Sequence, residues 1–149
     1  MYLRGGCLIV TLALASAGGP MEDTNGVITI TTDFSESKPL TVVCNFHVSK
    51  SVIANLTKLK LFSSVDGTMY TPVGSITSKK LTYGLKRKMI TLNGFFGPDS
   101  FLAVTWRSPD AGFCRYYRCS AKGREPSRGK LKKVFKSYKL DAKDGGGCQ

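Results

Sequence analysis

Short segments of alternating apolar and polar residues, separated by clusters of Gly, Pro, Asn, Asp and Ser, run along the chain from residue 27 onward. Alternation with a period of two is typical of a β-strand with one buried face, whereas an amphipathic helix repeats about every 3.6 residues. The pattern predicts strands at residues 27–30, 40–48, 57–62, 89–92, 100–106 and 115–121, with short edge strands at 73–76 and 80–83. We therefore expect an all-β domain.

The same alternation separates core positions from surface positions. In the segment 40–48, the core-facing residues are Leu40, Val42, Cys44, Phe46 and Val48. The later strands direct inward Leu59, Leu61, Leu102, Val104, Trp106, Tyr117, Cys119 and Ala121. Two core-facing cysteines, Cys44 and Cys119, thus lie on separate strands.

Two segments have a less certain pattern. Residues 130–140 form either a last strand or a short basic helix, because their periodicity does not decide between the two. Asn93-Gly94 is a strong turn signal and predicts that the strand before it ends at Leu92.

The first residues predict a secretory signal rather than a part of the fold. Arg4 precedes an apolar run at residues 7–15, which is shorter than the about 20 residues that span a bilayer. Ala15 and Ala17 supply the small residues that a signal peptidase requires, so we expect cleavage after Ala17. This predicts a signal peptide at 1–17, a domain at 18–140, a flexible glycine-rich tail at 141–149, and a secreted, extracellular protein.

Removal of the signal leaves four cysteines, Cys44, Cys114, Cys119 and Cys148. An oxidising compartment favours disulfides, and four cysteines allow three pairings that the sequence cannot rank without a fold. No pair has the C-x₂₋₄-C spacing of a zinc site, and His47 is the single histidine, so we expect no metal centre and no cofactor. A hydrolase is also disfavoured, because no motif supplies a nucleophile with its base.

Cys44, Cys119 and Tyr117 resemble the signature of an immunoglobulin sandwich. In that fold, cysteines on strands B and F bridge the two sheets, and a tyrosine lies two residues before the second cysteine. The resemblance implies a Cys44–Cys119 disulfide and a corner tyrosine at Tyr117. The usual strand C tryptophan is replaced by Leu59 and Leu61, while Trp106 ends the expected strand E.

Within residues 40–123, the sequence is similar to the Ig-like domains of gastropod fibrinogen-related proteins and related secreted lectins. The matching segments are Thr57-Lys-Leu-Lys-Leu61, Gly74-Ser-Ile76, Ser100-Phe-Leu-Ala-Val-Thr-Trp106 and Tyr117-Arg-Cys119. This resemblance implies a recognition module for microbial or parasite surface molecules. Lectin activity does not carry over, since those proteins share recognition with a C-terminal domain that is not found here.

The remaining cysteines leave two alternatives open. Cys114 lies in an expected insertion before strand F, and Cys148 lies in the glycine-rich tail. They pair within the chain, or Cys148 forms a disulfide-linked dimer with another chain.

Charge suggests which partners to expect. The chain has 22 Lys and Arg against 10 Asp and Glu, a net charge of +12. Such a surplus favours anionic partners, although it also keeps a secreted protein soluble. The densest cluster, taken as a candidate anionic-ligand site, consists of Lys122, Arg124, Arg128, Lys130, Lys132, Lys133 and Lys136.

Two functions follow from these observations. The first is a secreted recognition module that binds a protein or an anionic glycan. The second is a cationic effector that contacts anionic membrane surfaces through residues 115–143. Nucleic acid is the least expected partner, because export separates the protein from it. Asn55-Leu56-Thr57 is the single N-glycosylation sequon, in an expected loop between strands B and C.

Overall fold

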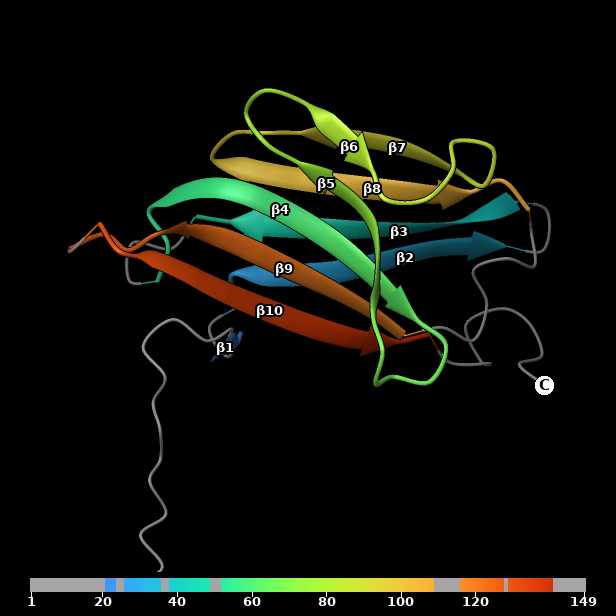
Figure 1. The fold of residues 1–149 in the computed structure, drawn as a ribbon, viewed down its shortest axis with the longest axis horizontal. Helices are drawn as coiled ribbons and strands as arrows, with labels where there is room; N and C mark the ends of the chain where they lie inside the picture. Colours follow the sequence, from blue (N-terminus) through green and yellow to red (C-terminus); the bar gives the residue numbers. More distant parts are fainter. Residues whose placement is uncertain are drawn as a thin grey trace, which may run out of the picture.

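The computed structural model of the protein describes residues 21–23, 26–35, 38–48, 52–108, 116–127 and 129–140. These residues form no helix and two packed sheets (Figure 1). The strands pair antiparallel, except for one short parallel pairing between the first and the last strand. The first sheet has six strands in the order β1 (Met21–Glu22), β10 (Leu131–Lys139), β9 (Tyr116–Arg124), β4 (Asn55–Ser64), β5 (Thr71–Ile76) and β6 (Leu81–Tyr83). The second has four strands in the order β2 (Ile28–Ser35), β3 (Lys38–His47), β8 (Asp99–Trp106) and β7 (Ile90–Phe95).

The strand order is that of a variable-type immunoglobulin sandwich. Such a sandwich has the sheets A-B-E-D and G-F-C-C′-C″. Here β2, β3, β8 and β7 occupy A, B, E and D, and β10, β9, β4, β5 and β6 occupy G, F, C, C′ and C″. The expected all-β, immunoglobulin-like β-sandwich is therefore confirmed.

The core lies between the sheets and is built from the inward positions of the alternating strands. Trp106, Tyr117, Phe46, Leu59 and Leu61 are fully buried. Burial of each large apolar side chain contributes about 1.5–3 kcal/mol, so these residues stabilise the contact between the two layers. Leu59 and Leu61 fill the place on strand C that a tryptophan takes in antibody domains.

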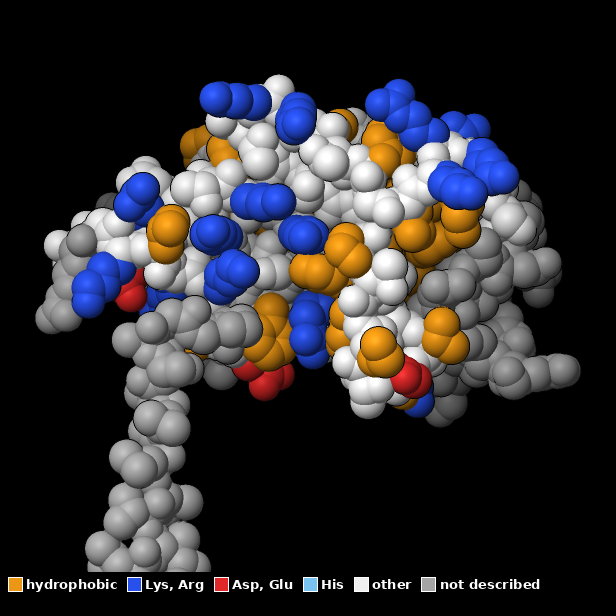
Figure 2. Space-filling model, viewed as in Figure 1, with side chains coloured by type: hydrophobic (Ala, Val, Ile, Leu, Met, Phe, Trp, Pro, Cys, Tyr) orange, Lys and Arg blue, Asp and Glu red, His pale blue; other side chains and the backbone are white. Residues whose placement is uncertain are grey.

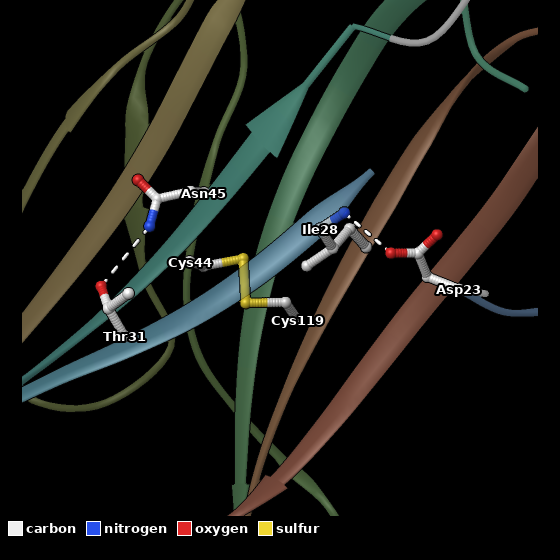
Figure 3. The surroundings of a disulfide bond; sticks show 6 residues. All are labelled: Asp23, Ile28, Thr31, Cys44, Asn45 and Cys119. Atoms are coloured by element: carbon white, nitrogen blue, oxygen red, sulfur yellow. Dashed lines mark hydrogen bonds between the residues drawn. A yellow bond between two sulfur atoms is a disulfide. The ribbon is translucent and has the colours of Figure 1, made fainter. Parts of the chain in front are cut away.

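A disulfide joins the two sheets through this core. Cys44 on β3 bonds to Cys119 on β9, and their Cα atoms are 5.8 Å apart. Figure 3 shows the bond crossing between the layers, beside β2. Both cysteines are fully buried, so the crosslink lies within the hydrophobic core.

The first two strands, β1 and β2, belong to different sheets, so the chain crosses from one sheet to the other between them. The two-residue strand β1 pairs in parallel with β10, and the next strand, β2, pairs with β3. Asp23 stabilises the change: its backbone N–H donates to the Phe135 carbonyl at 2.7 Å, and its carboxylate accepts from the Ile28 N–H at 2.9 Å (Figure 3). The short β1 leaves most of the outer edge of β10 without a partner strand among the described residues.

The structure decides one alternative that the sequence left open, strand or helix at residues 130–140, and corrects other expectations. Residues 131–139 form a strand and not a helix. Asn93 and Gly94 lie inside β7, because the connection to β8 comes later, where the Ser100 hydroxyl accepts from the Gly97 N–H. Val48, expected in the core, is 44% exposed because β3 ends at His47.

Several expectations lie outside the described residues. They concern the signal peptide at 1–17, the tail at 141–149, Cys114, Cys148 and Arg128. In the part of the chain that the structure does describe, no helix is long and apolar enough to cross a membrane.

Candidate anionic-ligand surface

Three lysines lie side by side across the outward face of the six-stranded sheet. Lys58 on β4 is opposite Lys122 on β9, and Lys122 is opposite Lys133 on β10. Their inward neighbours, Leu59, Ala121 and Val134, are buried, so the three lysine side chains project to the solvent side. Adjacent strands are about 4.8 Å apart, which makes this a short, dense line of positive charge. We call Lys58, Lys122 and Lys133 the lysine row.

The lysine row is part of a larger basic surface. The outward positions of the same three strands also hold Lys60, Arg118, Arg124 and Lys139. Figure 2 shows Lys and Arg side chains gathered over β4, β9 and β10, with acidic side chains at the rim of the view. We refer to this surface as the cationic face, which consists of Lys58, Lys60, Arg118, Lys122, Arg124, Lys133 and Lys139.

No carboxylate neutralises this surface among the residues that the structure describes. Among the described residues, the ion pairs are Lys132–Glu125 at 4.0 Å and His47–Asp99 at 3.6 Å. Neither pair includes a residue of the cationic face. Like charges directly opposite on neighbouring strands destabilise a sheet. The fold therefore tolerates a local repulsion that an anionic ligand would relieve.

The surroundings of Lys60 disfavour the charged form of its side chain. Burial lowers the pKa of Lys60 below its usual 10.5, and the charges of Lys58 and Lys133 lower it further. Lys60 lies one step along β4 from the lysine row, and its ammonium is 5.0 Å from the centre of the Phe62 ring. The positive charges of Lys58 and Lys133 therefore act on the Lys60 ammonium.

Aromatic rings hold the other cationic groups. The Arg118 guanidinium lies over two rings, 4.1 Å from the centre of Tyr70 and 4.6 Å from the centre of Phe135. The Lys139 ammonium is 5.5 Å from the centre of the Tyr116 ring. Each exposed contact of this kind contributes about 0.5–1 kcal/mol, so the rings orient the cations on the surface.

The basic residues singled out from the sequence are divided by the structure. Lys122, Arg124 and Lys133 belong to the cationic face. Lys132 and Lys136 alternate with them on β10 and share the inward side with Val134, where Lys132 pairs with Glu125. Lys130 lies in the connection between β9 and β10, and Arg128 lies outside the description.

Sequence reasoning missed Lys58 and Lys60 as members of the surface. Their alternation with Leu59 and Leu61 does place them on an outward face. No sequence signal, however, tells that β4 pairs with β9, about 60 residues later, in the register that aligns Lys58 with Lys122.

The outer face of the four-stranded sheet has a different chemistry. Its outward strand positions contain no Lys or Arg among the described residues. They are mostly small or neutral, and one cross-strand pair, Thr41 and Thr105, joins its hydroxyls at 2.9 Å. The described residues therefore form one cationic face and one face without Lys or Arg, whose charged outward residues are Asp33 and Asp99.

The sequon lies at one end of the cationic face. Asn55 is the exposed first residue of β4, not a loop residue as expected, and it is opposite Arg124. The Thr57 hydroxyl donates to the carbonyl of Lys122 at 2.9 Å. A glycan on Asn55 would consequently stand next to the lysine row.

The other candidate chemistry is sparse in the described residues. His47 is exposed on the outward side of β3, near the still more exposed Asp99. No group of three or more His, Cys, Asp and Glu side chains lies close enough there to hold a metal ion. The cationic face therefore remains the candidate site in the part of the chain that the structure describes.

Comparisons with known proteins bear on the fold. No family model matches the chain, and a search of curated proteins finds no match. Among solved structures, 143 chains match, and one of them is the structure of murine CRIg, an Ig-like domain. The similarity to murine CRIg has a TM-score of 0.54 and 14% sequence identity, and it covers 77% of this chain and 97% of that one. The protein is thus similar in structure to an immunoglobulin-like domain, and its fold is an immunoglobulin-like β-sandwich.

Proposed function

We propose that this protein is an extracellular recognition module that binds an anionic glycan through its cationic face. The observation that carries the proposal is the lysine row, three adjacent lysines for which the described residues provide no carboxylate. A ligand with closely spaced sulfates or carboxylates would remove this repulsion and release counterions.

The details of the face favour a glycan over nucleic acid. Single-stranded nucleic acids are bound mainly by stacking of bases on open aromatic rings. Here the rings of Phe62, Tyr116, Tyr70 and Phe135 are within about 4–5.5 Å of cationic heads, which lie over them. The face therefore offers charged donors more than open rings.

The buried disulfide supports an extracellular location. Disulfides persist in oxidising compartments, and Cys44–Cys119 agrees with the secretory signal expected at residues 1–17. The resemblance to gastropod fibrinogen-related proteins supports a more specific version of the proposal, in which the glycan belongs to a microbial or parasite surface and the protein acts in innate defence.

The cationic effector has less support. That hypothesis uses residues 115–143 as one membrane-active segment. In the described part of this segment, β9 and β10 are paired with each other along their length, and their basic residues are distributed over both sides of the sheet. The basic residues of 115–143 therefore do not form the single polar face that a membrane-binding amphipathic segment requires.

Heparin chromatography with charge-matched variants tests the proposal. Lys58, Lys122 and Lys133 are changed together to Gln, and a control protein carries Lys79→Gln, Lys80→Gln and Lys88→Gln, which remove the same charge at exposed sites away from the row. We expect the first variant to elute from heparin at clearly lower NaCl than the control. Equal elution of the two variants would contradict a binding site on the cationic face.

A second comparison tests the class of ligand. The wild-type protein is titrated with a heparin octasaccharide, a single-stranded DNA oligonucleotide of equal charge, and phosphatidylserine vesicles. We expect the tightest binding to the octasaccharide, with a loss in the lysine-row variant. Tighter binding to DNA or to vesicles would replace the glycan proposal with one of those two classes.

A further inference from the structure

Arg118 occupies a special position in the middle of the cationic face. It lies on β9, four residues before Lys122, and its side chain contacts residues from two other segments. The guanidinium lies over the rings of both Tyr70, just before β5, and Phe135 on β10. The Arg118 Nε–H donates a hydrogen bond to the Ser137 hydroxyl at 2.9 Å. The guanidinium is thus fixed in position and orientation before any ligand arrives.

The remaining hydrogen-bond donors of Arg118 are unused within the described residues. A guanidinium has five N–H donors, of which Nε–H is taken by Ser137. No carboxylate there forms an ion pair with Arg118, and no described acceptor is bound by Nη1 or Nη2. Two parallel N–H groups of a guanidinium match the two oxygens of a carboxylate or sulfate.

We propose that Arg118 forms a specific oxyanion subsite within the glycan-binding surface, where the guanidinium binds one carboxylate or sulfate of the ligand in a two-pronged arrangement. This inference rests on the proposed function and deepens it. The lysine row supplies attraction that depends little on geometry, because ammonium groups are mobile point charges. Arg118 supplies the part of the binding that depends on the geometry of the ligand, because its planar guanidinium binds two oxygens at once.

The distance between Arg118 and the lysine row indicates what kind of ligand can contact both of them. Four residues along a strand correspond to about 13 Å, so Arg118 and Lys122 contact groups that are well separated. Lys60, opposite Ser120, lies between them on the neighbouring strand. A small anion cannot span this distance, whereas an extended oligosaccharide with an oxyanion on successive units can.

The test uses a substitution that keeps the charge. Arg118→Lys retains one positive charge but loses the two-pronged geometry. The matched control is Arg87→Lys, an arginine outside the cationic face that also lies over a ring, 4.8 Å from the centre of Tyr83. Affinity for a heparin octasaccharide is measured by calorimetry for both variants, and thermal unfolding checks that both are folded.

We expect Arg118→Lys to weaken octasaccharide binding about tenfold, the usual effect of losing a charged hydrogen-bonded contact, and Arg87→Lys to leave it unchanged. Ser137→Ala, which frees the guanidinium without changing the charge, is expected to weaken binding about two- to threefold. Equal affinities of wild type, Arg118→Lys and Ser137→Ala would overturn the subsite.

Chemically modified octasaccharides identify the group that Arg118 binds. If the penalty of Arg118→Lys disappears with carboxyl-reduced heparin, the subsite holds a carboxylate, and if it disappears with desulfated heparin, the subsite holds a sulfate. A penalty that persists unchanged with both probes contradicts the subsite. Failure of the proposed function is recognised separately, since the lysine-row variant would then bind as tightly as its control.

Discussion

Asp66 organises the turn between β4 and β5. One of its carboxylate oxygens accepts from the Thr68 N–H at 2.8 Å, from the Met69 N–H at 3.0 Å and from the Ser64 hydroxyl at 2.9 Å. Next to it, Gly67 has a φ of +81°, a conformation that glycine adopts without strain. The hydrogen bonds from the Thr68 and Met69 backbones hold the pKa of Asp66 well below its usual 3.8.

Changing Asp66 to Asn should make the protein less sensitive to acid. Because the folded-state pKa is depressed, the charge of Asp66 stabilises the fold above the usual pKa and this stability is lost as the pH falls toward the folded-state value. Urea unfolding between pH 7 and pH 2 should show a stability gap between wild type and Asp66→Asn that shrinks with acidification. The exposed Asp33→Asn is the control, and a gap that stays constant with pH would refute the role of the charge.

Lys60 illustrates the opposite sign at the residue scale. Its pKa is lowered by burial and by Lys58 and Lys133, so the charged form weakens the fold at neutral pH. The unfolded state then binds more protons than the native state between the lowered pKa and 10.5, and stability rises with pH in that window.

Substitution of Lys60 by Gln should therefore stabilise the protein slightly at pH 7, despite the loss of the contact with Phe62. The advantage of Lys60→Gln over wild type should decrease as the pH rises toward 10.5. Chemical unfolding at pH 7, 9 and 10 measures the difference. Lys80→Gln, at an exposed site, should lack this trend, and a Lys60→Gln protein less stable than wild type at pH 7 would contradict the explanation.

At the scale of elements, the disulfide between β3 and β9 is the principal crosslink in the described residues. Cys44 and Cys119 are 75 residues apart in sequence. A bridge that closes a loop of this size lowers the entropy of the unfolded chain and stabilises the fold by about 4 kcal/mol.

Replacing Cys44 and Cys119 together with Ala should thus lower the free energy of unfolding by about 4 kcal/mol. Denaturant titration of the double variant and the wild type, both under non-reducing conditions, measures this loss. Addition of a reductant should destabilise the wild type by much more than the double variant, which keeps Cys114 and Cys148. A wild type unaffected by complete reduction would show that the crosslink contributes little.

The strands also show how far periodicity alone can predict an element. Alternation was sufficient for β3, β4, β8 and β9, since one side of each strand packs in the core. It was insufficient for β10, because this strand lies near the sheet edge and carries lysines on both sides: Lys132 and Lys136 on one, Lys133 and Lys139 on the other. Val134 is the single buried residue of β10, so this strand has almost no apolar period to detect.

At the scale of the whole molecule, charge is segregated between the two sheets. The cationic face covers β4, β9 and β10 (Figure 2), while the outward strand positions of the other sheet lack Lys and Arg in the described residues. A surface with one sign of charge steers an anionic partner toward one orientation.

This segregation predicts a salt-dependent affinity. Binding of the heparin octasaccharide should weaken steeply between 50 and 300 mM NaCl, and the slope against the logarithm of salt concentration should fall by roughly one unit for each lysine contact removed. The lysine-row variant should accordingly have a slope smaller by roughly three. The variant with Lys79, Lys80 and Lys88 changed to Gln should keep the wild-type slope, and equal slopes in all three proteins would contradict the arrangement.

The position of Asn55 leads to a prediction about regulation of the same surface. Asn55 is opposite Arg124, so a glycan attached there would shield one end of the cationic face. We expect protein secreted by cultured animal cells to carry this glycan and to elute from heparin at lower salt than its Asn55→Gln variant. Intact mass measures the modification, and both proteins made in bacteria, without the glycan, should elute together. Equal elution of the glycosylated protein and Asn55→Gln would refute the shielding.

The sequence by itself was enough to predict an all-β domain and the inward placement of Cys44, Cys119 and Tyr117, while the sandwich was implied by their resemblance to the immunoglobulin signature. The strands and the inward placement depend on a period of two within each segment, which is local and can be read from neighbouring residues. The sequence also revealed the positive charge, but not which cations act together.

Only the tertiary structure decided the composition of the site. The lysine row exists because Lys58, Lys122 and Lys133 are aligned by the registers of two separate strand pairings. The proposed subsite at Arg118 depends on Tyr70 and Phe135, which come from different segments to contact its guanidinium. Alternation tells which face a side chain takes, whereas the register between strands far apart in sequence is set by the packing of the whole core.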